Sequence, residues 1–344
     1  MHQLRHKDPT GKHARHAALA IEAALGEEMF ADTVKASVGV HTQVPILYPG
    51  TRSFLHNGDL YPQIEGGSFS SLSDLISEMT GGKQQNLAFN KTGAAGVVGT
   101  AAHLWLVNSW PVAGAAGGTT GSGVARSKSS QGAFNFTNAA GGDTLHLIGG
   151  TFHGSIGTQV LVLYDRLWDM THTMTVDPRS TDGTAPTRYQ DSTAAGTVLT
   201  GEVTTVLPAS SPTVTFDYID QAGNNTTSPA NTIRSAAAVN SSPFPLGQWF
   251  AQIDSADTGI RAFQNSANGI NLSAAMASGV VTWILAKPLA FIPIPTANVP
   301  VILDGINSAM SLVRILDDAA LAFLEIKGAT NATNWFGNIT LCSG

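Results

Sequence analysis

Apolar and polar residues alternate along much of the chain from about residue 84 onwards, which is the pattern of β-strands. Residues 213–219 are a predicted strand, and the strict alternation of 213–218 gives it one buried and one solvated face. Residues 159–164 are apolar on both faces, as expected of a central strand. Turn-forming residues separate such segments, and 220–224 is a predicted hairpin turn. The other predicted strands are 102–108, 144–150, 157–164, 201–207, 259–263, 269–272, 280–285, 320–326 and 338–342.

Helical periodicity is confined to two segments near the N-terminus. In residues 12–34 apolar side chains recur at spacings of three and four, which predicts an amphipathic helix. Residues 71–79 predict a second, short helix, because Ser71 and Asp74 form a start signal and two glycines follow as a stop signal. The segments 114–123 and 177–196 are rich in small polar residues, Gly and Pro, and they are predicted loops.

The composition favours a large β-protein. Of the 344 residues 43% are hydrophobic and 12% charged, the net charge is −6, and 36 residues are glycine. Helical bundles need far more Glu, Lys, Leu and Arg, and disordered chains combine low hydrophobicity with high net charge. We therefore expect a mainly β fold: a β-sandwich or jelly-roll-like body with an N-terminal basic arm and one helix. The expected divisions are 1–35 for arm and helix, 36–198 for a β-rich domain with long loops, and 199–344 for a β-sandwich-like domain packed on it.

The single cysteine and the hydropathy of the chain indicate the cellular compartment in which we expect it to fold. Cys342 is the single cysteine, so an internal disulfide and a multi-cysteine zinc site are excluded. The first residues lack the apolar core of a signal peptide, and the longest apolar stretch, 280–303, contains Lys287 and several prolines that no membrane helix would keep. We expect assembly in a reducing cytoplasm, no membrane contact and no cofactor.

The N-terminal sixteen residues are basic, whereas the rest of the chain is acidic. Their cations are Arg5, Lys7, Lys12 and Arg15, and Asp8 is the one acid among them. Such an arm is suited to docking on an acidic surface of a partner protein, and a solvated, frayed terminus is the alternative. Nucleic acid is a weaker candidate, because four cations neutralise few phosphates and no aromatic residues are interleaved with them.

Motifs of common enzymes are missing from the sequence. It contains no P-loop, no dinucleotide-binding glycine pattern, no His-Glu-x-x-His and no Gly-x-Ser-x-Gly. Asp257-Thr258-Gly259 matches the aspartic-protease triplet, but that chemistry needs two carboxylates sharing a proton and hence a second copy. A turn before a strand is the favoured interpretation, and we expect a protein without enzymatic activity.

Two groups of residues carry side chains suited to metal binding. Asp165, Asp169, His172 and Asp177 form the first, although 164–170 has the pattern of a strand end entering a turn, where Arg166 would pair with an acid. The second is His146 and His153, predicted on neighbouring strands without a third ligand. A structural role is the favoured interpretation of both groups.

The tryptophans are spread along the chain. They are predicted to anchor the core or an interface, and a carbohydrate-binding platform is the alternative. Those considered are Trp105, Trp110, Trp249, Trp283 and Trp335.

Several short pieces follow one another in a fixed order from residue 160 to the C-terminus: Tyr164-Asp165-Arg166-Leu167-Trp168, Thr215-Phe216-Asp217-Tyr218 with Asp220-Gln221-Ala222-Gly223, Ser255-Ala256-Asp257-Thr258-Gly259-Ile260-Arg261-Ala262-Phe263-Gln264, and Leu272-Ser273 before 280–294. In the order of these pieces the chain resembles virion structural proteins of tailed bacteriophages. The resemblance covers about half the chain and departs from the family pattern at Lys287-Pro288, where a longer strand is expected.

This resemblance implies assembly on a phage particle rather than catalysis. We expect a capsid cement or decoration protein that docks through its arm on other virion proteins, foremost the major capsid protein, and self-associates, as a trimer in the simplest case. A tail-associated or host-glycan-binding protein is the alternative. An enzyme acting on cell-wall polymer or protein is the third hypothesis, resting on the carboxylates of Asp165, Asp169 and Asp257.

Overall fold

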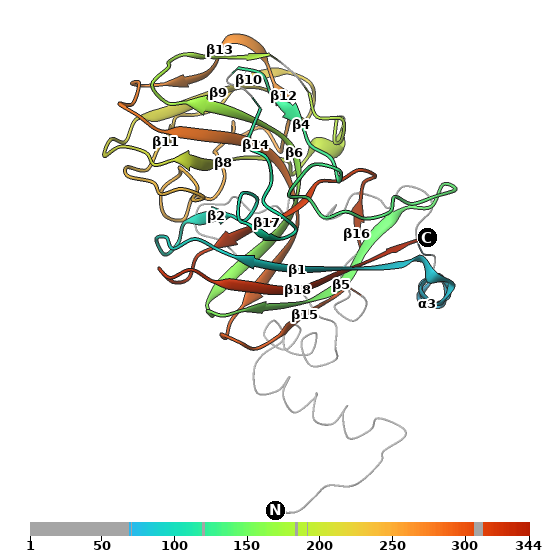
Figure 1. Cartoon of the computed structure of the whole chain (residues 1–344). Helices are drawn as coiled ribbons and strands as arrows, with labels where there is room; N and C mark the ends of the chain where they lie inside the picture. Colours follow the sequence, from blue (N-terminus) through green and yellow to red (C-terminus); the bar gives the residue numbers. More distant parts are fainter. Residues whose placement is uncertain (1–68, 70, 119–120, 183–184, 191, 306–311) are drawn as a thin grey trace, which may run out of the picture. The chain divides into compact units, whose positions relative to one another are not determined.

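The computed structural model describes residues 69, 71–118, 121–182, 185–190, 192–305 and 312–344, all within one compact unit, Pro49–Gly344. The mainly β fold is confirmed: three antiparallel sheets and one α-helix make up this described part (Figure 1). No helix in it is long and apolar enough to cross a membrane. Arg5, Lys7, Lys12 and Arg15, and the helix predicted at 12–34, lie outside the described residues.

The short helix predicted at 71–79 is confirmed as α3 (Leu72–Glu78). Its N-cap is Ser71, whose hydroxyl accepts a hydrogen bond from the Asp74 amide at 3.1 Å. One π-helical turn, Met79–Lys83, follows, and Gly82 adopts φ +85°, where a residue with a Cβ would be strained. The predicted start and stop signals therefore act as expected.

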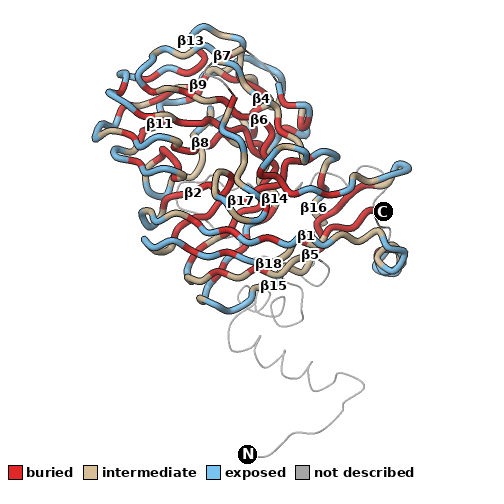
Figure 2. The backbone as a smooth tube through the Cα atoms, in the orientation of Figure 1, coloured by how far each residue is buried: buried red, intermediate tan, exposed pale blue. Residues whose placement is uncertain are grey.

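A central sheet of strand order β2-β17-β6-β14-β8 organises the fold, with β4 paired to β6. Its axis is the antiparallel pair of β6 and β14, which are the two longest strands and are buried along most of their length (Figure 2). The bounds are β2 (Ala101–His103), β4 (Val124–Ala125), β6 (Gln159–Thr173), β8 (Val198–Thr205), β14 (Val280–Ile294) and β17 (Leu321–Ile326).

A bulge in β6 decides which way its side chains point. Arg166 pairs with Ala286 but Trp168 pairs with Leu285, so Leu167 is an extra residue that reverses the alternation. Because paired residues share a face, Arg166 and Asp169 end on the same face of the central sheet. By the same argument the apolar residues of both halves of β6 share the other face.

A second sheet, here called the β5 sheet, covers one end of that apolar face. Its strand order is β15-β5-β18-β1-β3, with β16 paired to β5. Phe89, Phe152 and Trp335 point inward and pack with Leu161 and Leu163 of β6 in one core. The bounds are β1 (Gln84–Thr92), β3 (Ser109–Trp110), β5 (Leu145–Gly154), β15 (Val301–Asp304), β16 (Val313–Ile315) and β18 (Asn334–Ser343).

A third sheet, the β9 sheet, covers the other end of the apolar face. Its order is β10-β9-β13-β7, with β11 and β12 also paired to β9. Phe216 and Phe263 pack there with Trp168 and Trp283, with the Phe216 and Trp283 ring centroids 4.9 Å apart. The bounds are β7 (Arg179–Asp182), β9 (Thr213–Asp220), β10 (Asn225–Thr227), β11 (Asn231–Thr232), β12 (Ile260–Phe263) and β13 (Asn265–Leu272).

The structure corrects several predicted boundaries. The segment 164–170 is no strand end, because β6 continues to Thr173. The strand predicted at 102–108 ends at His103, and β14 continues past Lys287-Pro288, with a second bulge between Pro288 and Ala290. The predicted loop 177–196 contains β7 and the 3-10 turn Ser192–Ala194. The sheets do not divide at residue 198, since each takes strands from both sides of it.

Candidate functional site

Asp169 lies at the centre of a buried ionic network on the face of the central sheet opposite the two large cores. The Arg126 guanidinium binds it through two atoms, with Nε to Oδ2 and Nη2 to Oδ1 both at 2.8 Å. Arg166 Nε donates to the same Oδ2 at 2.7 Å. The side chains of Asp169 and Arg166 are fully buried, so Asp169 holds two cations away from water.

Glu202 and Trp105 complete the surroundings of Arg166. The Arg166 guanidinium lies 4.7 Å from the centre of the Trp105 ring, and its Nη1 is 3.4 Å from Glu202 Oε2. Burial raises the pKa of Glu202 to about 7, although the charge of Arg166 opposes that shift. Glu202 Oε1 and Arg166 Nη2 have no hydrogen-bond partner in the described structure. The contact between these two groups is therefore looser than that between Arg166 and Asp169.

The network fixes two loops over the sheet. Arg126 Nη2 donates to the carbonyl of Ala116 at 2.7 Å, and the Gly118 amide donates to Asp169 Oδ1 at 3.2 Å. The Trp105 indole donates to the Ala115 carbonyl at 2.9 Å. The first part of the predicted loop 114–123 is thus held at Ala115, Ala116 and Gly118.

Asp165 makes a separate ion pair on the opposite face. Arg188 Nε and Nη2 each donate to this buried carboxylate at 2.8 Å, and the Ala320 amide donates to it as well. Burial raises the pKa of Asp165, against the opposing effect of Arg188. Arg188 also donates to the Arg126 carbonyl at 2.9 Å, so this pair joins two loops.

The other residues of the proposed metal group have structural partners of their own. The Trp283 indole donates to His172 Nδ1 at 3.2 Å, and His172 Nε2 lies 2.9 Å from the Val176 carbonyl. Asp177 accepts from the Leu272 amide at 2.6 Å. Within the part of the chain that the structure describes, no three His, Cys, Asp or Glu side chains are placed to hold one metal ion.

The histidine pair and Asp257, the remaining candidate residues, do not form a site with other chemically suitable groups among the described residues. His146 and His153 lie on one strand, β5, not on neighbouring strands, and they are seven positions apart, which in a strand is about 23 Å. His153 stacks on Phe336 with ring centroids 4.5 Å apart. Asp257 accepts a hydrogen bond from the Tyr218 hydroxyl, and burial raises the pKa of its carboxyl.

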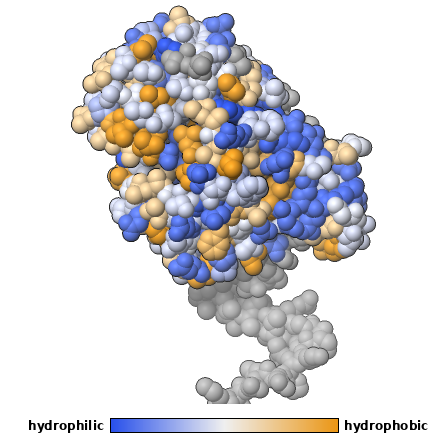
Figure 3. Space-filling view, viewed as in Figure 1, coloured by the Kyte–Doolittle hydropathy of each residue, from blue (hydrophilic) through white to orange (hydrophobic). Residues whose placement is uncertain are grey.

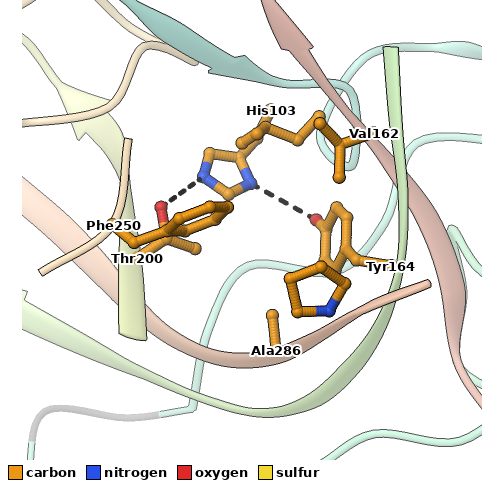
Figure 4. A pocket seen from close by; sticks show the side chains of 8 residues that line it. His103, Val162, Tyr164, Thr200, Phe250 and Ala286 are labelled. Atoms are coloured by element: carbon orange, nitrogen blue, oxygen red, sulfur yellow. Dashed lines mark hydrogen bonds between the residues drawn. The ribbon is translucent and has the colours of Figure 1, made fainter. Parts of the chain in front are cut away.

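A small cavity beside His103 is a packing gap rather than a ligand site. Its volume is about 10 Å³, enough for about one water molecule. His103 lies between the Tyr164 hydroxyl and Thr200 Oγ1, each at 3.3 Å (Figure 4). Burial lowers the pKa of His103 well below its usual range, so the ring stays neutral. The His103 ring therefore has a packing role in the core.

Away from the end that carries Arg314, which pairs with His146, the outward face of the β5 sheet has almost no charge. Phe336 pairs with Asn90 and His153, and Ile302 with Thr151. The exposed fractions of Trp110, Phe336 and Ile302 are 62%, 44% and 72%, which is high for large apolar side chains. We call the following set the outer face: Asn86, Ala88, Asn90, Thr92, Trp110, Gly149, Thr151, His153, Ile302, Asp304, Asn334, Phe336, Asn338 and Thr340.

Figure 3 shows apolar residues scattered among polar ones on the side of the molecule that it draws. Asn and Thr supply most polar groups of the outer face, and Asp304 is its single acid. Such a surface suits broad contacts built from hydrogen bonds and a few apolar anchors.

Sequence reasoning missed Arg126, Arg188 and Glu202. Each is an isolated charged residue with no motif around it, and their partners lie 43, 23 and 36 positions away. Only the pairing of Arg166 with an acid carried a local signal, and it is confirmed.

We expect the contribution of Glu202 to the free energy of unfolding to fall as the pH rises from about 4.5 to about 7, whereas the lowered pKa of His103 acts in the opposite direction in both proteins compared below. The pKa of Glu202 is raised in the folded chain, so between these values the folded state binds a proton that the unfolded state has lost. The Glu202→Gln variant lacks this proton uptake and should lose about 1–3 kcal/mol less than the wild type over the same interval. Urea unfolding of both proteins at several pH values measures the difference, and identical slopes would contradict it.

The chain was compared with protein-family models, with curated proteins and with solved structures, and none of them matches it.

Proposed function

We propose that this chain is a non-enzymatic structural protein of a tailed-bacteriophage particle, and specifically a capsid cement or decoration protein. The proposal starts from the family resemblance of residues 160–344. The acidic groups suggested for catalysis or metal binding support it, because Asp165 and Asp169 are buried in bidentate arginine pairs. Such carboxylates are occupied and inaccessible to a substrate.

The observation that carries the proposal is the outer face of the β5 sheet. A nearly uncharged face with exposed Phe336 and Ile302 is costly to leave in water and well suited to lie against another protein. We propose that this face packs on a neighbouring virion subunit. The basic arm with Arg5, Lys7, Lys12 and Arg15 then docks on an acidic part of the shell.

Charge placed on the outer face should prevent this packing. We expect Ile302→Asp and Phe336→Asp each to reduce incorporation into particles about tenfold or more, because a buried unpaired carboxylate is strongly unfavourable at an interface. The amount of the chain in purified particles, measured by quantitative mass spectrometry, gives the result.

The matched control is Val206→Asp, which changes an exposed apolar residue (53%) beyond β8, outside the outer face. It should be incorporated like the wild type. Normal incorporation of both outer-face variants would refute the proposed contact, provided that circular dichroism shows all three proteins folded.

A further inference from the structure

A groove lies along the edge of the β5 sheet, where Asn86, Ala88 and Trp110 of the outer face form part of its lining. Its volume is about 640 Å³, within the range of small-molecule and oligosaccharide sites. One wall is β1 at residues 86–88, another is 110–112 with Trp110, and a third is the loop 128–135. None of the ionic networks described above opens into it.

The walls of this groove are held rigidly. Gly132 has φ +98°, and a Cβ there would lie 2.4 Å from Gly114 Cα, so the two loops touch backbone to backbone. Gln85 bonds both backbone groups of Thr137, with its amide nitrogen donating at 2.9 Å and its oxygen accepting at 2.7 Å. Lys91 Nζ donates to the Val107 carbonyl at 2.8 Å beneath the Trp110 segment. A preformed site of this kind loses little entropy on binding.

The groove presents an aromatic ring and amides to solvent. Trp110 is 62% exposed, so its ring offers a flat apolar surface. Gln131 and Asn135 are exposed, and within the described residues neither side chain has a hydrogen-bond partner. Amides of this kind both donate and accept, as needed for sugar hydroxyls.

The charge of the lining excludes other ligand classes. No carboxylate lines the groove, so it does not attract cations or basic peptides. Lys128 is its single ionic residue, and the ammonium group already donates to Asn138 Oδ1 at 2.7 Å. An uncharged, hydroxyl-rich ligand matches these groups.

A peptide strand added to β1 is the competing occupant. β3 pairs with β1 only at Asn90 and Lys91, so the edge at 86–88 is free of any described strand. At the next position along this edge, the Gln85 side chain binds the Thr137 backbone, and the segment around Thr137 blocks an added strand there. The remaining edge is shorter than an average strand of about 5–6 residues, which favours the sugar over the peptide.

We propose that this groove binds a neutral saccharide, with Trp110 stacking on the apolar face of a sugar ring and Gln131 and Asn135 bonding its hydroxyls. Because Trp110 also belongs to the outer face, a saccharide and a neighbouring subunit would compete for this edge of the sheet. Saccharide binding is therefore measured on the isolated chain, where its failure is distinguishable from a failure of incorporation into particles.

The test uses the purified full-length chain on a glycan array that carries neutral glucans, N-acetylglucosamine oligomers and bacterial O-antigen repeats, followed by titration in solution. We expect at least one neutral oligosaccharide to bind. Trp110→Ala should weaken that binding about tenfold or more, and Asn135→Ala should weaken it by a smaller factor. Phe336→Ala removes an exposed aromatic residue of the same sheet outside the groove lining and should bind like the wild type.

Three outcomes would overturn the proposal. One is the absence of binding on the array and at millimolar concentration in solution. Another is binding that Trp110→Ala leaves unchanged although the variant is folded. The third is displacement of the sugar signal by an uncharged extended peptide whose own binding is tighter, which would make the groove a strand-addition site.

Discussion

Replacement of Asp169 by alanine is expected to lower the free energy of unfolding by about 3–5 kcal/mol. This carboxylate is the common partner of Arg126 and Arg166, and its side chain is fully buried. Without it, two guanidinium groups would remain close together in the interior with no full counter-charge. A domain is stable by only about 5–15 kcal/mol, so the variant should unfold at much lower denaturant concentration.

Glu78→Ala is the matched control for this measurement. Glu78 pairs with Lys83 at 2.8 Å, but both side chains are partly exposed and Lys83 keeps its second partner, Asp143. Its loss should cost about 1 kcal/mol or less. Asp169→Asn keeps the shape and removes the charge, so it should be nearly as unstable as the alanine variant. If both Asp169 variants unfolded like Glu78→Ala, the network would contribute no stability.

Deletion of residues 1–16 is expected to abolish incorporation into particles and to leave the three sheets folded. The arm brings Arg5, Lys7, Lys12 and Arg15 to a chain whose remaining residues are acidic overall. Their attraction to an acidic shell surface should be screened by salt, so binding of the wild type should also weaken as ionic strength rises. Co-sedimentation of the purified chain with particles made without it measures both effects.

Two further variants distinguish the effect of the charge of the N-terminal arm from the effect of its length. Changing the four cations to alanine should reduce binding about as strongly as the deletion. Exchanging each Lys for Arg and each Arg for Lys should preserve it, because the charge remains. Undiminished incorporation of the deleted chain would rule out docking through the arm.

Local patterns predicted the fold class well. Strict alternation in 213–218 identified β9, the capping pair Ser71 and Asp74 identified α3, and the apolar run 159–164 identified the start of β6. The length of β6 could not be predicted, because the charged residues Asp165, Arg166 and Asp169 are usual at a strand end and here are buried by partners from distant loops.

The candidate sites were harder to predict than the fold. The bulge at Leu167 puts Arg166 and Asp169 on one face, and a bulge leaves no fixed mark in a sequence. The outer face becomes visible only when Phe336, Ile302 and Trp110, far apart in the chain, are aligned by strand register. The groove likewise depends on the contact between Gly114 and Gly132.

Cryo-electron microscopy of intact particles, with this chain traced into the density, tests the central claim most directly. The account predicts copies on the outer surface of the head, with the outer face of the β5 sheet against a neighbouring subunit and residues 1–16 on the shell. Copies confined to the tail, or particles without the chain, would contradict the assignment as a capsid cement protein.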